Sequence, residues 1–185
     1  MIDYDEESWF AMRDLKRSNA KLPAYKMLAG KVTEVFTPLV EKIITRKGKK
    51  EKIQTPFMPD LLFAKSTTDV LTPIVDTTPT LQYRYKRGGK YCEPVTVRND
   101  DMNRFIGATR CDSPYKYYTP EEVSPALYGR KIKIVGGSLN GFTGRLMTKR
   151  GSKVKRLIVE LDGILAVGVE IQPEFIQIIE EATEQ

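Results

Sequence analysis

The 185-residue chain is 41% hydrophobic and 29% charged, which allows a packed core and argues against extensive disorder. Its net charge of +6 fits a nucleic-acid or acidic protein partner, but it fits a merely basic soluble protein equally well. The chain has no histidine, and Cys92 and Cys111 lack metal-ligand spacing, so we expect neither a metal site nor a disulfide framework.

No apolar run approaches the roughly 20 residues that a membrane-spanning helix needs. The acidic start, residues 1–7, differs from the positively charged first region of a signal peptide. We therefore expect a cytoplasmic protein that does not enter a membrane. We also expect a monomer that carries no cofactor.

The first part of the chain predicts strands interrupted by short helices. Residues 8–13 form an expected strand in which Trp9, Ala11 and Arg13 share one face. Residues 23–30 predict a short helix with one apolar stripe. Residues 35–39 predict a second strand, at a sheet edge because it contains a proline.

Two runs, 40–45 and 51–55, flank a basic segment and predict a hairpin with the tip cations Arg46, Lys47, Lys49 and Lys50. The nearly continuous apolar run at 60–65 is the best candidate for the central strand. In it, Leu61 and Phe63 share one face. Residues 70–75 have helical spacing, but Pro73 predicts a short or broken helix.

Residues 81–85 and 91–95 flank a pair of glycines and predict another hairpin. A helix with a buried stripe is expected from Asn99 to about Ile106. Residues 111–120 lack periodicity and contain two prolines, which is typical of a linker. The remaining residues predict five short strands, which fit a small barrel.

A distinctive motif spans residues 129–146. Ile132 and Ile134 alternate with lysines, as in a half-buried strand, and a glycine-rich turn and a second strand follow. This stretch resembles a KOW motif, a feature of small SH3-like barrels in transcription elongation factors and ribosomal proteins. The matching positions are Gly129, Lys131, Ile132, Ile134, Gly137, Gly141 and Gly144.

Two further segments extend the resemblance to the NusG family of transcription factors. Trp9-Phe10 opens the first strand, where the family has Trp-Tyr or similar, and residues 56–63 follow its Pro-Leu-Phe-Pro-Gly-Tyr-Val-Phe pattern. The resemblance implies an α+β N-terminal domain, an antiparallel sheet flanked by helices, over residues 1–107. A linker at 108–126 and an SH3-like KOW barrel at 127–181 would follow.

Within this family, the chain looks most like the UpxY-type antiterminators of Bacteroidetes, which act at capsular polysaccharide operons. It departs from the family pattern at Asp60, where Gly or Asn is common, and at Leu61, where an aromatic is common. The implied function is a factor that binds RNA polymerase and suppresses pausing or termination. A second hypothesis is an RNA-binding or ribosome-associated KOW protein.

The resemblance also implies a docking surface for the clamp helices of RNA polymerase. The matching residues are Trp9, Ala11, Arg13, Leu61 and Phe63, which we expect to be left exposed on the sheet, because an exposed apolar patch often marks a binding site. The segment near Thr72 matches the family's contact with the opposite side of the polymerase cleft. The KOW barrel would engage a ribosomal protein or termination factor Rho.

The basic hairpin either contacts upstream DNA phosphates or is simply solvated. Tyr115, Tyr117 and Tyr118 either stack on single-stranded bases, such as those of nascent RNA, or hold the linker against its domain. The glycine-rich turn lacks the Gly-Lys-Ser/Thr ending of a phosphate-binding loop. With no nucleophile or kinase signature, we expect no catalytic activity.

Overall fold

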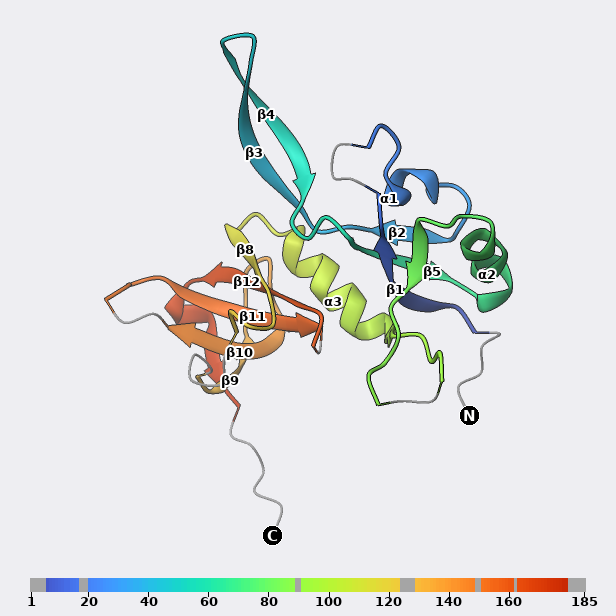
Figure 1. The fold of residues 1–185 in the computed structure, drawn as a ribbon. Coiled ribbons are helices and arrows are strands. Elements are labelled where there is room, and N and C mark those ends of the chain that lie inside the picture. The colour runs from blue at the N-terminus through green and yellow to red at the C-terminus, as the bar shows by residue number, and fades with distance from the viewer. Residues whose placement is uncertain are drawn as a thin grey trace. The chain divides into compact units, whose positions relative to one another are not determined.

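The computed structural model describes residues 6–16, 20–88, 91–123, 129–148, 151–161 and 163–179 (Figure 1). The chain forms two compact units, Met1–Asn99 and Asp100–Gln185. We predicted that the first domain extends to residue 107, whereas this division places residues 100–107 with the second unit.

The first unit contains an antiparallel sheet with β5 and β1 at its centre. Its strand order is β2-β5-β1-β6, and β7 also pairs with β1. The strands are β1 (Ser8–Asp14), β2 (Glu34–Phe36), β5 (Leu61–Ser66), β6 (Leu81–Tyr83) and β7 (Thr96–Val97). The apolar run at 60–65 therefore does mark a central strand. Strand β2 lies at an edge, as predicted, but it ends at Phe36, before Pro38.

Two short helices, α1 (Ala24–Met27) and α2 (Thr68–Asp76), cover one face of this sheet. Phe10 lies opposite Ala64 and Met12 opposite Leu62 in the β1–β5 register. These side chains form a buried core with apolar residues of α1, α2 and β6, namely Ala24, Leu28, Leu71, Leu81 and Tyr83. Pro73 lies inside α2, so the helix is short, as predicted, but is not broken.

The predicted basic hairpin is present as a separate two-stranded sheet, β3 (Leu39–Arg46) and β4 (Lys49–Pro56). At its turn, Lys47 and Gly48 both have positive φ angles, 48° and 77°. Two successive residues with positive φ are typical of a type I′ turn, which matches the twist of a hairpin. Figure 1 shows this hairpin as an arm that extends away from the five-stranded sheet of its unit.

The predicted hairpin of residues 81–95 is only partly regular. Beyond β6, Val95 donates its backbone N–H to the Arg84 carbonyl, and Lys86 donates to the Glu93 carbonyl. Tyr85 and Pro94 form an isolated bridge. This irregular pairing connects β6 to β7.

The second unit combines the helix α3 (Asn99–Thr109), which begins at the last residue of the first unit, with a six-stranded antiparallel sheet. The strand order is β13-β9-β10-β11-β12-β8. The strands are β8 (Tyr115–Tyr118), β9 (Lys131–Ile134), β10 (Thr143–Thr148), β11 (Lys155–Leu161), β12 (Leu165–Ile171) and β13 (Ile176–Ile178). A 3-10 turn, η2 (Pro173–Phe175), precedes β13. The five strands predicted after residue 127 correspond to β9–β13.

The predicted linker is wrong for part of its length, because it contains β8. This strand pairs with β12, and Tyr117 and Tyr118 are buried. The Tyr117 ring stacks on Phe105 of α3, with a centroid separation of 6.1 Å. The prolines on both sides of β8 favoured a linker in the sequence, whereas the structure shows a strand with two buried tyrosines. Residues 124–126 of the predicted linker lie outside the described residues.

Candidate functional site

The β1–β5 register places the predicted docking residues on one face of the sheet. Ala11 lies opposite Phe63, and Arg13 lies opposite Leu61. Trp9 is two residues from Ala11 and therefore points to the same side. This face, opposite the one covered by α1 and α2, is called the docking face below; it consists of Trp9, Ala11, Arg13, Leu61 and Phe63.

The expectation that the apolar residues of the docking face are exposed is wrong. Trp9, Ala11 and Phe63 are 0% exposed, and Leu61 is 1% exposed. The Phe63 ring contacts Phe36 of β2 at a centroid separation of 6.4 Å. A hydrophobic run on a central strand can be buried on both faces, and sequence alternation alone does not distinguish that case from an open patch.

One polar group is buried on the docking face without a partner. The indole Nε1 of Trp9 has no hydrogen-bond acceptor among the described residues. A buried donor left unsatisfied costs about 1–3 kcal/mol. Any group that reaches the indole N–H of Trp9 is therefore favoured if it supplies an acceptor.

Thr72 is not part of the docking face. It lies on α2, which packs against the opposite face of the sheet through Leu71. Its side chain is exposed, and its hydroxyl is 3.2 Å from the hydroxyl of Tyr83. Thr72 therefore lies away from the docking face, and its contact with the polymerase remains a prediction.

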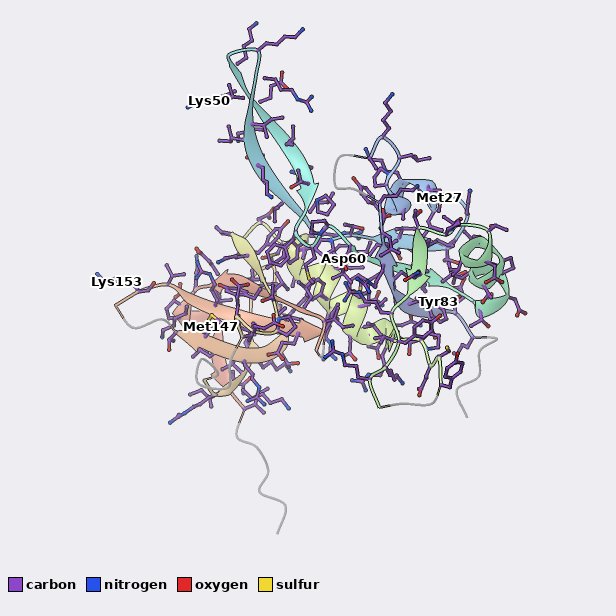
Figure 2. All side chains as sticks on the ribbon, in the orientation of Figure 1. Met27, Lys50, Asp60, Tyr83, Met147 and Lys153 are labelled. Atoms are coloured by element: carbon purple, nitrogen blue, oxygen red, sulfur yellow. The ribbon has the colours of Figure 1, made fainter. Side chains whose placement is uncertain are left out.

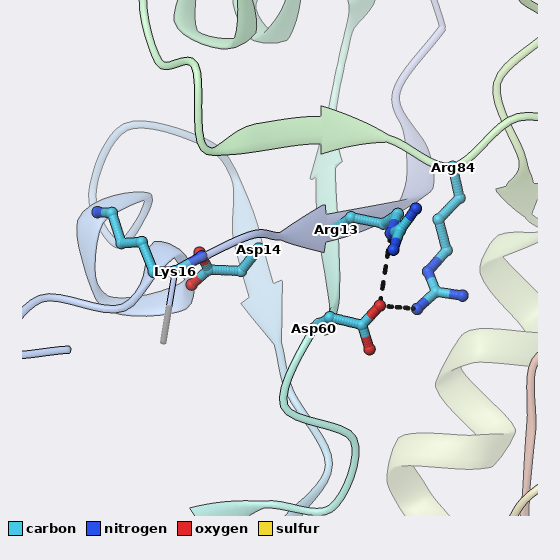
Figure 3. A network of polar contacts seen from close by, with 5 residues as sticks. All are labelled: Arg13, Asp14, Lys16, Asp60 and Arg84. Atoms are coloured by element: carbon cyan, nitrogen blue, oxygen red, sulfur yellow. Dashed lines mark hydrogen bonds and ion pairs between the residues drawn. The ribbon is translucent and has the colours of Figure 1, made fainter. Parts of the chain in front are cut away.

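The accessible end of the docking face carries three charged residues (Figure 3). One carboxylate oxygen of Asp60, Oδ2, lies 3.4 Å from Arg13 Nε and 3.0 Å from Arg84 Nη2. The side chains of Arg13, Asp60 and Arg84 are 49%, 39% and 26% exposed. We call these three residues the Arg–Asp–Arg cluster. Sequence reasoning missed Arg84, because nothing in the pattern indicates that it meets a residue 24 positions earlier.

Burial lowers the pKa of Arg84. Desolvation lowers the pKa of its guanidinium, Asp60 acts in the opposite direction, and the nearby charge of Arg13 lowers it again. The Arg84 Nε is buried and has no partner among the described residues. The cluster therefore holds one carboxylate against two guanidiniums, a surplus of positive charge that is partly removed from water.

Asp14 fixes the end of β1 beside this cluster. Its buried carboxylate accepts hydrogen bonds from the backbone N–H groups of Lys16, at 2.9 Å, and Ala24, at 2.6 Å. Its own backbone N–H donates to the carbonyl of Asp60 at 3.0 Å. Strand β1, the start of α1 and the Asp60 backbone are thus tied together. Figure 3 shows Asp14 beside Lys16 at the end of β1.

The tip cations are exposed on the β3–β4 arm, and Figure 2 shows Lys50 projecting near its end. Residues 39–56 contain six lysines and arginines and only two glutamates. One of these cations, Lys52, pairs with Glu41 at 2.9 Å. The arm therefore concentrates positive charge at a distance from the sheet, which suits contact with a polyanion.

Arg46 also lines a cavity of about 400 Å³ in the first unit, together with Lys16 and Lys26. The sequence did not associate these two lysines with the hairpin. Their positions become neighbouring only because α1 folds back beside the base of β4. Arg46 thus shares this cavity with two further cations, and the carboxylate of Asp14 lines it as well.

The KOW-like residues form a strand, a turn and a return strand. In β9, Ile132 and Ile134 are buried and Lys131 and Lys133 are exposed, which confirms the predicted alternation. In the following turn, Gly136, Gly137 and Gly141 have positive φ angles, and the Asn140 side chain accepts a hydrogen bond from Gly136 N–H at 2.8 Å.

Gly129 and Gly144 are required by close backbone approach rather than by φ. A β-carbon at Gly129 would lie 2.5 Å from the carbonyl oxygen of Leu146, and one at Gly144 would lie 2.3 Å from that of Ile158. Real β-carbons do not approach so closely. These two glycines therefore set the spacing between β10 and its neighbours.

Among the described residues, no group of three or more Cys, Asp or Glu side chains could hold a metal ion. In the same part of the chain, no helix is both long and apolar enough to span a membrane.

These features define a protein of two units, a sheet-based α+β unit with a basic arm and a second unit built on a six-stranded sheet. Residues 7–106 match the family model described as "NusG: Transcription termination factor nusG". Because this match covers more than half of the chain, the protein belongs to the NusG family, whose members are non-enzymatic transcription factors that bind RNA polymerase.

A solved structure described as "Domain interaction in Thermotoga maritima NusG" is similar over 96% of this chain and 99% of that chain. The sequence identity is 17% and the TM-score is 0.47. No curated protein matches the chain in a sequence comparison.

Proposed function

We propose that this protein is a transcription elongation factor that binds RNA polymerase through the docking face and suppresses pausing or termination. Membership of the NusG family carries the proposal. The arrangement of Trp9, Ala11, Leu61 and Phe63 on one sheet face supports it, because apolar anchors with a charged rim are typical of sites that receive a partner helix.

Docking on this face requires a rearrangement, since its apolar side chains are buried. The partner must therefore bind a state in which they are accessible, and the apparent affinity falls by the fraction of molecules in that state. The unpaired indole N–H of Trp9 would gain an acceptor if the partner supplies one.

Three finer assignments belong to the same proposal. Thr72 contacts the opposite side of the polymerase cleft, and the tip cations contact upstream DNA phosphates. The second unit is an SH3-like KOW barrel that engages a ribosomal protein or Rho. The chain is a UpxY-type factor with its action confined to polysaccharide operons, which a transcript profile after deletion of the gene tests directly.

Site-specific crosslinking tests the docking face without disturbing the core. A photo-crosslinking amino acid in place of Arg13, the exposed member of the face, should crosslink to the clamp helices of purified RNA polymerase. The same amino acid in place of Tyr91, which is 98% exposed and outside the face, is the matched control. Equal crosslinking from both positions, or none from position 13, contradicts the proposed docking mode.

A further inference from the structure

We propose that the Arg–Asp–Arg cluster is a carboxylate-recognition site, at which an acidic side chain of the docked protein partner binds between Arg13 and Arg84. The inference rests on the proposed function, because it names the chemistry that the partner presents at the rim of the docking face. It also assigns Asp60 the role of an internal carboxylate that occupies part of the site before the partner arrives.

The hydrogen-bonding capacity of the two guanidiniums is not used up by Asp60. A guanidinium carries five N–H donors in a planar fork that fits a carboxylate through two parallel bonds. Here both arginines reach the same oxygen of Asp60, each through one nitrogen, and the Arg13 and Arg84 side chains remain 49% and 26% exposed. A second carboxylate can therefore bind without displacing the first.

The charges point to an anion. The cluster has two positive groups and one negative group, and the half-buried Arg84 is partly desolvated. A surplus charge in such a place is stabilised by an opposite charge that arrives with the partner.

The site is preorganised by the backbone. The Arg84 N–H donates to the Ala11 carbonyl at 2.9 Å, and the Arg84 carbonyl accepts from Val95 N–H at 2.7 Å. Asp60 is held through its own carbonyl by Asp14 N–H. A site whose groups are already in place loses less conformational entropy when a ligand binds.

A protein carboxylate suits this site better than a nucleic-acid phosphate. The cluster borders Leu61 and Ala11, and arginine beside apolar anchors is typical of protein interfaces. A single surplus charge is a weak attraction for a polyanion, whereas the β3–β4 arm carries a larger one. The cluster is also the accessible part of the docking face, so it is the part that a partner meets first.

The test measures the association rate of the full chain with purified RNA polymerase at about 50 and 200 mM salt, a range over which screening changes strongly. Arg13→Gln and Arg84→Gln should each slow association about three- to tenfold at low salt and reduce its salt dependence. Asp60→Asn should accelerate association about threefold, because it removes the competing charge. Lys31→Gln, at an exposed lysine after α1, is the control and should change neither the association rate nor its salt dependence.

The sign of the Asp60→Asn effect separates recognition from a merely structural role. A structural ion pair predicts a lower melting temperature and slower or unchanged association, which would overturn the inference. Weaker binding of the arginine variants to duplex DNA, with unchanged binding to polymerase, would also overturn it. If the wild-type chain does not bind polymerase, the proposed function fails and the inference fails with it. If the wild-type chain binds and the cluster variants associate at the wild-type rate, the inference alone fails.

Discussion

Replacing Phe63 with alanine decides whether the docking face is part of the core in solution. The Phe63 ring is fully buried, contacts the Phe36 ring and faces Ala11 across the β1–β5 pair. Phe→Ala changes in protein interiors cost about 3–5 kcal/mol. The upper half of this range applies here, because Ala11 is too small to fill the space and hydrogen-bonded strands limit collapse.

Urea unfolding gives the measurement, with Trp9 as the reporter. It is the only tryptophan in the chain and lies on the same buried face, so its fluorescence follows the first unit selectively. With a loss of about 4 kcal/mol and a denaturant slope of about 2 kcal/mol per molar, the midpoint should fall by roughly 2 M. Val70→Ala, at a position on α2 that is 47% exposed, should shift it far less.

A Phe63→Ala midpoint equal to that of Val70→Ala would refute the burial argument. It would mean that the ring is exposed in solution, as the sequence first suggested. The same reasoning makes Phe63→Asp unsuitable as a binding variant, because a carboxylate at this position would destabilise the unit before any partner binds.

Three further outcomes are expected. Gly144→Ala should cost about 3 kcal/mol, because its β-carbon meets the Ile158 carbonyl, whereas Gly141→Ala should cost about 1 kcal/mol from its positive φ alone; equal urea midpoints by far-UV circular dichroism, which also follows the second unit, would contradict this. Burial raises the pKa of Tyr117 well above its ordinary value, so the unfolded chain loses this proton first. The stability that depends on the neutral ring is complete below about pH 10 and is lost as the pH rises further. Tyr117→Phe should therefore lose less stability than wild type between about pH 10 and 12, with Tyr91→Phe as the control. Glutamine at all four tip cations should weaken duplex DNA binding and lower its salt slope by about 0.9 for each lost phosphate contact, without changing the urea midpoint; unchanged DNA binding would show that the hairpin is only solvated.

Local structure was readable from the sequence where it depends on neighbours in the chain. The alternation of Ile132 and Ile134 with lysines predicted the buried and exposed positions of β9. The segment around Lys47-Gly48 predicted the turn of the basic hairpin, and the motif glycines predicted the turn after β9. In each case the period of a strand or the φ preference of a residue is enough to decide the outcome.

The sequence failed where the outcome depends on distant segments. It did not show that β8 pairs with β12, since the two prolines near Tyr117 favour a linker. It did not show that Arg84 would reach Asp60 across the sheet. Both results require strands that are far apart in sequence to become neighbours, and no local propensity encodes that pairing.

The sequence by itself therefore determined which residues of β1 and β5 share a face, because side chains alternate along a strand. Only the tertiary structure decided that Trp9, Ala11, Leu61 and Phe63 are buried while Arg13 remains accessible at the rim. The physical reason is that alternation fixes the direction in which a side chain points, whereas its exposure depends on what the rest of the chain places over it.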